Sequence, residues 1–397
     1  MSKIKVRVFD DVQFLGKGYA DQIRSVKRTS TNLDVDTIDR DQFRQAMEEL
    51  ENRRKHARGK PTARERCIVD EFDVFIIDYD LLDLPDAASF LTAENVAYLA
   101  RCYSSCKIIV ILNQFGKNTF DLTLRGPPES FADLNLGSKH LECPGLWGIA
   151  GEPGDFRPWV WPVLPQAVSA FQRRVELLKG NLKEPILSFL GMTSVAESLP
   201  RNVVEFLSGP KDPAKVTFGE FVMKSGNGLR PKDKCASDND EQMARIAAAR
   251  VAKWLERLVL PGQDILVDAP HLVSRYPSLL KGGRKNVKRW NRTASFASLN
   301  KLGIDHAKIE DSRFQKTGWI SRPAWFWRDV SKSTDIDEVK DPWNAEQPEW
   351  VFCEDTSTFE PPDKCRQFVA DLPSPFVQRF VRKVANVEYT PSVRFSL

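Results

Sequence analysis

Residues 72–83 read FDVFIIDYDLLD, a short apolar run that ends in acidic residues. A run of this length, rich in Val, Ile and Phe and bounded by charge, predicts a strand buried on both faces, as in parallel sheets. Asp78 and Asp80 then stand at the carboxyl end of that strand. Ligands of open α/β sheets bind outside the carboxyl ends of the strands. The stretch therefore predicts a site as well as a strand.

The segments around this strand alternate between strand and helix patterns. The alternation predicts an α/β fold in residues 1–180, a doubly wound five-stranded parallel sheet of the flavodoxin-like order 2-1-3-4-5. We expect residues 116–158, rich in Gly and Pro, to be an insertion in this domain, and residues 181–397 to form a second, mixed α+β domain. The other predicted strands are Ile4–Phe9, Leu33–Ile38, Lys107–Leu112 and a segment ending at Trp161-Pro162, and the predicted helices are Tyr19–Arg28, Asp41–Arg58, Ala93–Tyr103 and Gln166–Lys179.

The composition is that of an ordinary globular protein. Hydrophobic residues make up 42% of the 397 residues and charged residues 28%, so disorder is not expected. The net charge of +4 is too small to indicate a nucleic-acid partner by itself. No apolar run approaches the roughly 20 residues that span a bilayer, and the polar first residues lack a signal-peptide pattern. We expect a cytoplasmic protein.

The usual cofactor and nucleotide signatures are missing from the sequence. The seven cysteines are scattered, and the one close pair, Cys102 and Cys106, has no second Cys/His pair to complete a zinc site. Neither a GxxxxGK[ST] loop nor a GxGxxG loop occurs, so nucleotide binding of those kinds has no support.

Acidic residues follow two of the predicted strands. Asp10 and Asp11 come directly after the first strand, and Asp78 ends the third. In strand order and acid placement, residues 1–180 resemble a response-regulator receiver domain. The resemblance implies that Asp10, Asp11 and Asp78 bind Mg²⁺ and that Asp78 is the phosphate acceptor.

Two positions depart from the receiver pattern. The family has Ser or Thr after its fourth strand and Lys-Pro after its fifth, where this chain is expected to carry Asn113 and Trp161-Pro162. Without that lysine a phosphoryl group would lack its positive partner, because Lys117 falls in the irregular loop. We therefore predict a receiver-like domain that acts without a phosphorylation switch.

An enzyme is the alternative. Carboxylates that converge on one pocket repel one another unless a cation or a proton intervenes, so Asp10, Asp11, Asp78 and Asp80 could serve a Mg²⁺-dependent phosphatase or nuclease. The Asp78–Asp80 pair is also similar to the paired aspartates of haloacid-dehalogenase-type phosphatases, although the family's later Ser/Thr and Lys motifs are not found. Alternation along a strand places Asp78 and Asp80 on the side opposite Tyr79, but the run leaves the sheet there, so the two acids need not both reach one pocket.

The second half offers a long helix and a histidine. Ser237 is expected to cap a helix that runs to Leu258 and ends at Pro261-Gly262. His271 follows Asp268 at the end of a short strand from Asp264. No nucleophile motif accompanies the pair, so we interpret it as a polar loop cap rather than a catalytic pair.

The densest basic run of the chain surrounds Trp290. On a helix much of the run would share one face, and basic residues beside an aromatic ring bind phosphates and stack bases. A solvated face that balances acids elsewhere is the alternative. The candidate residues for a nucleic-acid or protein partner are Lys281, Arg284, Lys285, Lys288, Arg289, Trp290 and Arg292.

The sequence thus favours an atypical receiver-like signalling or adaptor protein that docks a protein or nucleic-acid partner through its second half. Mg²⁺ is the one cofactor it suggests, and no membrane partner is expected. The acidic cluster keeps the hydrolase alternative open.

Overall fold

The structure is a computed structural model of the 397-residue chain. It describes residues 3–26, 33–57, 67–81, 92–113, 120–122, 126–148, 156–209, 211–224, 226–229, 239–281, 283–294, 307–316, 318–332, 336–370, 374–385 and 387. Lys117 and Ser237, which the sequence singled out, lie outside these residues.

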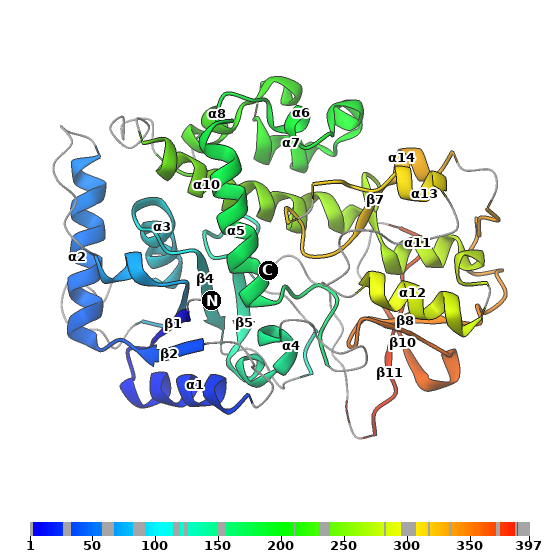
Figure 1. The fold of residues 1–397 in the computed structure, drawn as a ribbon, viewed down its shortest axis with the longest axis horizontal. Helices are drawn as coiled ribbons and strands as arrows, with labels where there is room; N and C mark the ends of the chain where they lie inside the picture. Colours follow the sequence, from blue (N-terminus) through cyan, green and yellow to red (C-terminus); the bar gives the residue numbers. More distant parts are fainter. Residues whose placement is uncertain are drawn as a thin grey trace.

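The N-terminal half is built on a parallel five-stranded sheet of order β2-β1-β3-β4-β5 (Figure 1). This confirms the predicted order 2-1-3-4-5 and the predicted α/β class. The central strand β3 is buried along its whole length, as its continuous apolar run requires. The strands are β1 (Ile4–Phe9), β2 (Leu33–Thr37), β3 (Val74–Asp78), β4 (Ile108–Asn113) and β5 (Leu134–Gly137).

The fifth strand is not where the sequence placed it. The strand predicted to end at Trp161-Pro162 is wrong, because β5 lies earlier and pairs with β4 from Val110–Leu134 onward. Trp161 instead packs edge-on against His140, with ring centroids 4.6 Å apart. Ser138 and Lys139 therefore follow the fifth strand, and the position after that strand is not occupied by an indole.

Helices cover both faces of the sheet. The helix α1 (Gln13–Ser25) lies on one face, and α2 (Arg40–His56) and α3 (Ala93–Tyr103) lie on the other (Figure 1). The helix α2 begins one residue earlier than expected, because Asp39 rather than Asp41 is its cap and forms a reciprocal capping box with Gln42.

Aromatic packing ties α2 to the sheet. The ring of Phe9 on β1 stacks on that of Phe43 on α2, with centroids 3.6 Å apart. Both side chains are almost completely buried, so this face of the sheet is closed by apolar contact.

The C-terminal half combines helices with small sheets, which confirms the predicted mixed α+β composition. The strands β6 (Leu266–Asp268) and β7 (Ala324–Phe326) form an antiparallel pair. A mixed sheet of order β10-β11-β8-β9 follows. Its strands are β8 (Val351–Cys353), β9 (Thr358–Glu360), β10 (Cys365–Val369) and β11 (Gln378–Arg382).

The described helices between β5 and the C-terminal mixed sheet range from 4 to 16 residues in length. They are α4 (Pro144–Trp147), α5 (Leu164–Lys179), α6 (Ile186–Phe189), α7 (Arg201–Leu207), α8 (Phe218–Met223), α10 (Asp240–Trp254), α11 (Ala269–Arg275), α12 (Arg284–Ala294), α13 (Ala307–Asp311) and α14 (Trp327–Val330).

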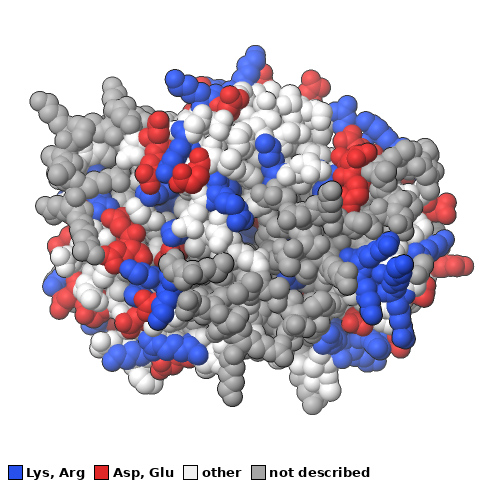
Figure 2. Space-filling view, viewed as in Figure 1, with Lys and Arg blue, Asp and Glu red and all other residues white. Residues whose placement is uncertain are grey.

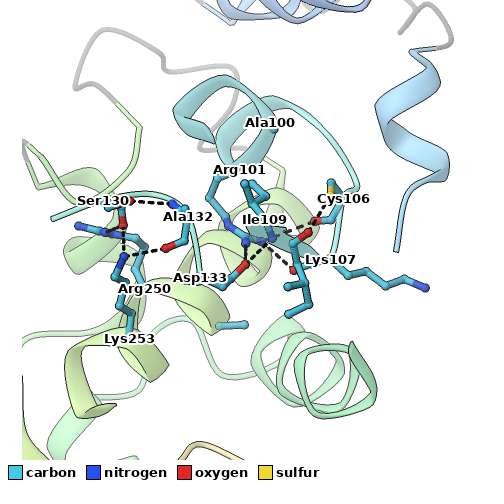
Figure 3. Close-up of polar contacts among 12 residues, drawn as sticks. Ala100, Arg101, Cys106, Lys107, Ile109, Ser130, Ala132, Asp133, Arg250 and Lys253 are labelled. Carbon is cyan, nitrogen blue, oxygen red and sulfur yellow. Dashed lines mark hydrogen bonds and ion pairs between the residues drawn. The ribbon is translucent and has the colours of Figure 1, made fainter. Parts of the chain in front are cut away.

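The helix α10 joins the two halves. It packs along α5 and against α3, and its buried cations reach the segment before β5 (Figure 3). Arg250 donates to the carbonyl oxygen of Ser130 at 2.7 Å, and Lys253 donates to those of Ser130 and Ala132 at 2.8 and 2.6 Å. A helix of the second half therefore completes the packing of the first, and the predicted domain boundary at residue 180 stays a prediction.

Among the helices that the structure describes, none combines the length and the apolar character needed to cross a bilayer.

Candidate functional site

Three carboxylates meet at the carboxyl edge of the parallel sheet. Asp10 and Asp11 follow β1, Asp78 ends β3, and these two strands pair directly, with Phe9 opposite Ile77. Parallel strands bring their carboxyl ends to one edge. Asp10 and Asp11 are each 4% exposed and Asp78 is 2% exposed, so the three acids form a buried group that we call the acid pocket.

Asp10 and Asp78 each have one carboxylate oxygen that accepts from a nearby backbone N–H group. The backbone N–H of Val12 donates to Asp10 Oδ1 at 2.7 Å, and that of Asp80 donates to Asp78 Oδ2 at 3.1 Å. The second oxygens, Asp10 Oδ2 and Asp78 Oδ1, are buried and accept no hydrogen bond. An unpaired buried carboxylate oxygen is costly, so the acid pocket favours a bound proton or a bound cation.

Proton affinity in the acid pocket is raised accordingly. Burial, with the charge of Asp11 as a further cause, raises the pKa of Asp10 to about 6 against the bond from Val12. Burial and then the charge of Asp10 raise the pKa of Asp78 to about 7. Near neutral pH, Asp10 and Asp78 are therefore each partly protonated and partly ionised.

The helix α1 closes one side of the acid pocket. A Cβ built on Gly16 would lie 3.3 Å from Asp10 Cβ, which is a tight contact, so glycine favours this close approach of the helix. Burial and the charges of Asp78 and Asp10 raise the pKa of Tyr19 to about 12, against a hydrogen bond with Ser138. The sequence singled out none of Gly16, Tyr19 and Ser138 for this site.

Asp80 and Asn113, the remaining polar candidates at this edge, are more exposed than the three buried acids. Asp80 is exposed, next to the half-exposed Tyr79, which fits the expectation that Asp78 and Asp80 need not share a pocket. Asn113 ends β4, half-buried. Lys139, two residues after β5, is exposed, and Trp161 packs on His140, three residues after β5.

The acid pocket is not a preformed metal centre. Among the described residues no three His, Cys, Asp or Glu side chains are arranged to hold a metal ion. The two free oxygens of Asp10 and Asp78 are the hard ligands that Mg²⁺ prefers. The residues therefore fit a cation by their chemistry, with Asp10 and Asp78 as first ligands and Asp11 beside them.

The predicted basic face lies on α12. Arg284, Lys285 and Lys288 are exposed, and Arg289 is half-buried. Lys281 precedes the helix instead of sharing its face, and Arg292 belongs to the helix although its side chain is not described. Figure 2 shows Lys and Arg side chains together on the part of the surface where α12 lies.

Trp290 belongs to the packing of α12. Its side chain is 1% exposed, and its Nε1 donates to the carbonyl oxygen of Leu279 at 3.2 Å. The ring packs against Trp325 and Phe359, with centroids 6.1 Å away in both cases. In this arrangement the indole has no free face on which a base could stack.

Asp268 and His271 form a cap, as the sequence indicated. Asp268 caps α11 and accepts from the backbone N–H of His271 at 3.3 Å. Burial lowers the pKa of His271 to about 3, so its ring is neutral. Burial alone would raise the pKa of Asp268, but the charges of Arg379 and Arg322 hold it below its ordinary value.

Around this cap lies a buried ionic network that the sequence did not reveal. Arg322 pairs with Glu256 at 2.8 Å and with Asp268 at 3.5 Å. Arg379 pairs with Glu354 at 3.0 Å. These partners are far apart in the chain, so no local pattern could have predicted them.

We compared the chain with protein-family models, with curated proteins and with solved structures, and none of the three comparisons found a match.

Proposed function

We propose that the N-terminal half is an atypical receiver-like docking module and that the second half contacts an anionic partner. The observation that carries the proposal is the acid pocket, in which Asp78 stands at the end of β3 beside Asp10 and Asp11 of β1 but is almost wholly buried. The acids have the order and placement of a receiver domain. Their burial argues against an open reaction site.

Electrostatics argue against a phosphorylation switch. A phosphoryl group on Asp78 would bring almost two further negative charges into a group of acids whose proton affinity is already raised. The half-buried Tyr19 lies close enough to feel the charges of Asp78 and Asp10, but its hydroxyl carries no positive charge to offset them. A module with this chemistry acts in one state, through its shape.

A cation would stabilise the acid pocket without any reaction. Mg²⁺ there would neutralise the carboxylates. Asp10 and Asp78 would supply the two oxygens that now accept no hydrogen bond, and the N–H groups of Val12 and Asp80 would hold the opposite oxygens in place. In this role Mg²⁺ is structural.

The surface proposed for the partner is the exposed face of α12. Arg284, Lys285 and Lys288 project from one short helix, and Trp290 anchors that helix from beneath. Such a face binds phosphates by charge and without reading bases. The proposed partner is therefore a nucleic acid or an acidic protein surface.

The second candidate is a Mg²⁺-dependent hydrolase. The two unpaired oxygens in the acid pocket favour it, because a metal held there could polarise a phosphoryl oxygen. The exposed Asp80, two residues beyond Asp78, would be its acid or base. This candidate requires the pocket to open.

One experiment separates the candidates. The full chain is incubated with Mg²⁺ and acetyl phosphate, and its intact mass is measured; parallel samples receive p-nitrophenyl phosphate or plasmid DNA. The docking module should gain no phosphoryl group and turn over neither substrate. A phosphoryl adduct that Asp78→Asn abolishes would restore the switch, and turnover lost in Asp78→Asn would establish the hydrolase.

A further inference from the structure

Two cysteines of the C-terminal sheet stand side by side. Cys353 Sγ, at the end of β8, lies 3.2 Å from Cys365 Sγ, at the start of β10. Cys353 is fully buried, whereas Cys365 is half-buried. The Cys365 thiol is therefore accessible to a small reagent, and the buried Cys353 thiol is in contact with it.

We propose that Cys353 and Cys365 form a reversible disulfide site, oxidised by a low-molecular-weight disulfide. The Cys365 thiolate attacks the oxidant, forms a mixed disulfide and releases one thiol. Cys353 then attacks Cys365 Sγ and releases the second thiol. In balance, the two protein thiols lose two electrons and two protons, and the oxidant is reduced to two thiols.

The hydrogen bond between the thiols distributes these roles. It lowers the pKa of Cys365, the accessible thiol, and it raises the pKa of Cys353, which burial raises further. Thiolates are the attacking species in exchange. Cys365 is thus the first nucleophile and Cys353 the resolving thiol.

The disulfide would fasten the segment through which the C-terminal sheet meets the N-terminal half. Between the two cysteines, the carbonyl oxygens of Asp355 and Glu354 accept from the N–H groups of Arg157 and Trp159, both at 2.7 Å. The hydroxyl of Ser357 donates to the carbonyl oxygen of Arg157 at 2.8 Å. Closing this loop covalently restricts the unfolded chain, so oxidation should raise the midpoint of thermal unfolding by several degrees.

Peptide mapping tests the site directly. The folded full chain is treated with oxidised glutathione, alkylated and digested with trypsin. No Lys or Arg lies between Asp341 and Lys364, so the expected product joins the peptide 341–364 to the dipeptide Cys365-Arg366, lighter by two hydrogens, and dithiothreitol separates it.

Matched variants define what each result means. Cys365→Ser should abolish the cross-link, and Cys353→Ser should accumulate a stable mixed disulfide on Cys365. Cys67→Ser, which keeps a donor near the Ala46 carbonyl oxygen, should leave the cross-link intact. If the wild-type chain stops at the mixed disulfide, pairs either cysteine elsewhere, or forms the cross-link only after denaturation, the proposal is overturned.

Discussion

Arg250 on α10 and Ser130 before β5 are joined by a hydrogen bond of 2.7 Å between the guanidinium Nη1 and the Ser130 carbonyl oxygen (Figure 3). The same Nη1 donates to the carbonyl oxygen of Glu129 at 2.9 Å, and the guanidinium lies over the ring of Phe131. Since the segment before β5 has little regular structure of its own, a buried cation from another part of the chain satisfies its carbonyl groups. The edge of the sheet therefore depends on α10.

This dependence predicts that Arg250→Ala is strongly destabilising. The change removes the donor of the Glu129 carbonyl oxygen, leaves the Ser130 carbonyl oxygen with Lys253 as its remaining side-chain donor, and removes the contact with Phe131. We expect a cost of roughly 3 kcal/mol in the free energy of unfolding. Urea unfolding followed by tryptophan fluorescence measures it. Arg201→Ala, on an exposed ion pair of α7, is the control and should change stability by less than about 1 kcal/mol. Equal effects of the two changes would mean that α10 does not hold this edge.

The strong periodic patterns in the sequence predicted the fold well. The bounds of β1 (Ile4–Phe9) and α3 (Ala93–Tyr103) are those expected from the sequence, because each has a regular apolar pattern and an end marked by polar residues. The helix α1 was predicted from Tyr19 but begins at Gln13. Gly16 lowers the helix propensity of its first turns, and in the structure this glycine lies against Asp10.

The features that the sequence did not predict depend on contacts between distant parts of the chain. The strand β5 is four residues long and contains Asn135, so its strand character comes from β4, with which Val110 and Leu134 pair. Trp159 and Trp161 gave a stronger apolar signal but serve the packing around His140 and Asp268. The acids of the pocket were visible because strand ends are local features, whereas Tyr19 and Ser138 come together only after folding.

Because Trp290 is buried, we expect it to stabilise the fold of α12 rather than to bind a partner. Trp290→Ala should destabilise the protein by roughly 3–5 kcal/mol, because it opens a large cavity beside Trp325 and Phe359. Trp290→Phe keeps most of the ring and should cost less. If Trp290 stacked on bases instead, Trp290→Ala would weaken binding to a single-stranded oligonucleotide and leave the unfolding midpoint unchanged. Calorimetry and fluorescence anisotropy on the same samples distinguish the two.

Charge reversal on α12 tests the proposed partner surface. Changing Arg284, Lys285 and Lys288 together to Glu should abolish binding of a fluorescent DNA duplex, because the three side chains are exposed and would supply the phosphate contacts. The fold should be unaffected, as judged by circular dichroism.

A matched triple change controls for net charge. Lys183, Arg201 and Lys215 are also exposed, and their reversal to Glu changes the net charge equally. The control variant should keep its affinity and its salt dependence. If both triple variants lose the same affinity, or if neither does, the face of α12 is only a solvated surface.

The acid pocket predicts how stability depends on pH. The folded-state pKa of Asp78, about 7, lies above its ordinary value of 3.8, so the folded protein binds this proton more tightly than the unfolded chain. The resulting contribution to stability is fully present below about pH 4 and is lost as the pH rises through about 7. Three pKa units correspond to at most about 4 kcal/mol.

Asp78→Asn should remove this loss, since an amide stays neutral and its oxygen still accepts from the N–H of Asp80. The variant should match the wild type near pH 4 and exceed its free energy of unfolding at pH 8, measured by urea titration. Asp80→Asn, at an exposed position, should run parallel to the wild type. Adding Mg²⁺ at pH 8 should stabilise the wild type and leave Asp78→Asn unchanged if Asp78 is a ligand. If the free energy of unfolding changes with pH in the same way for the wild type and Asp78→Asn, Asp78 ionises as readily in the folded as in the unfolded chain. That result would contradict a closed, buried acid pocket.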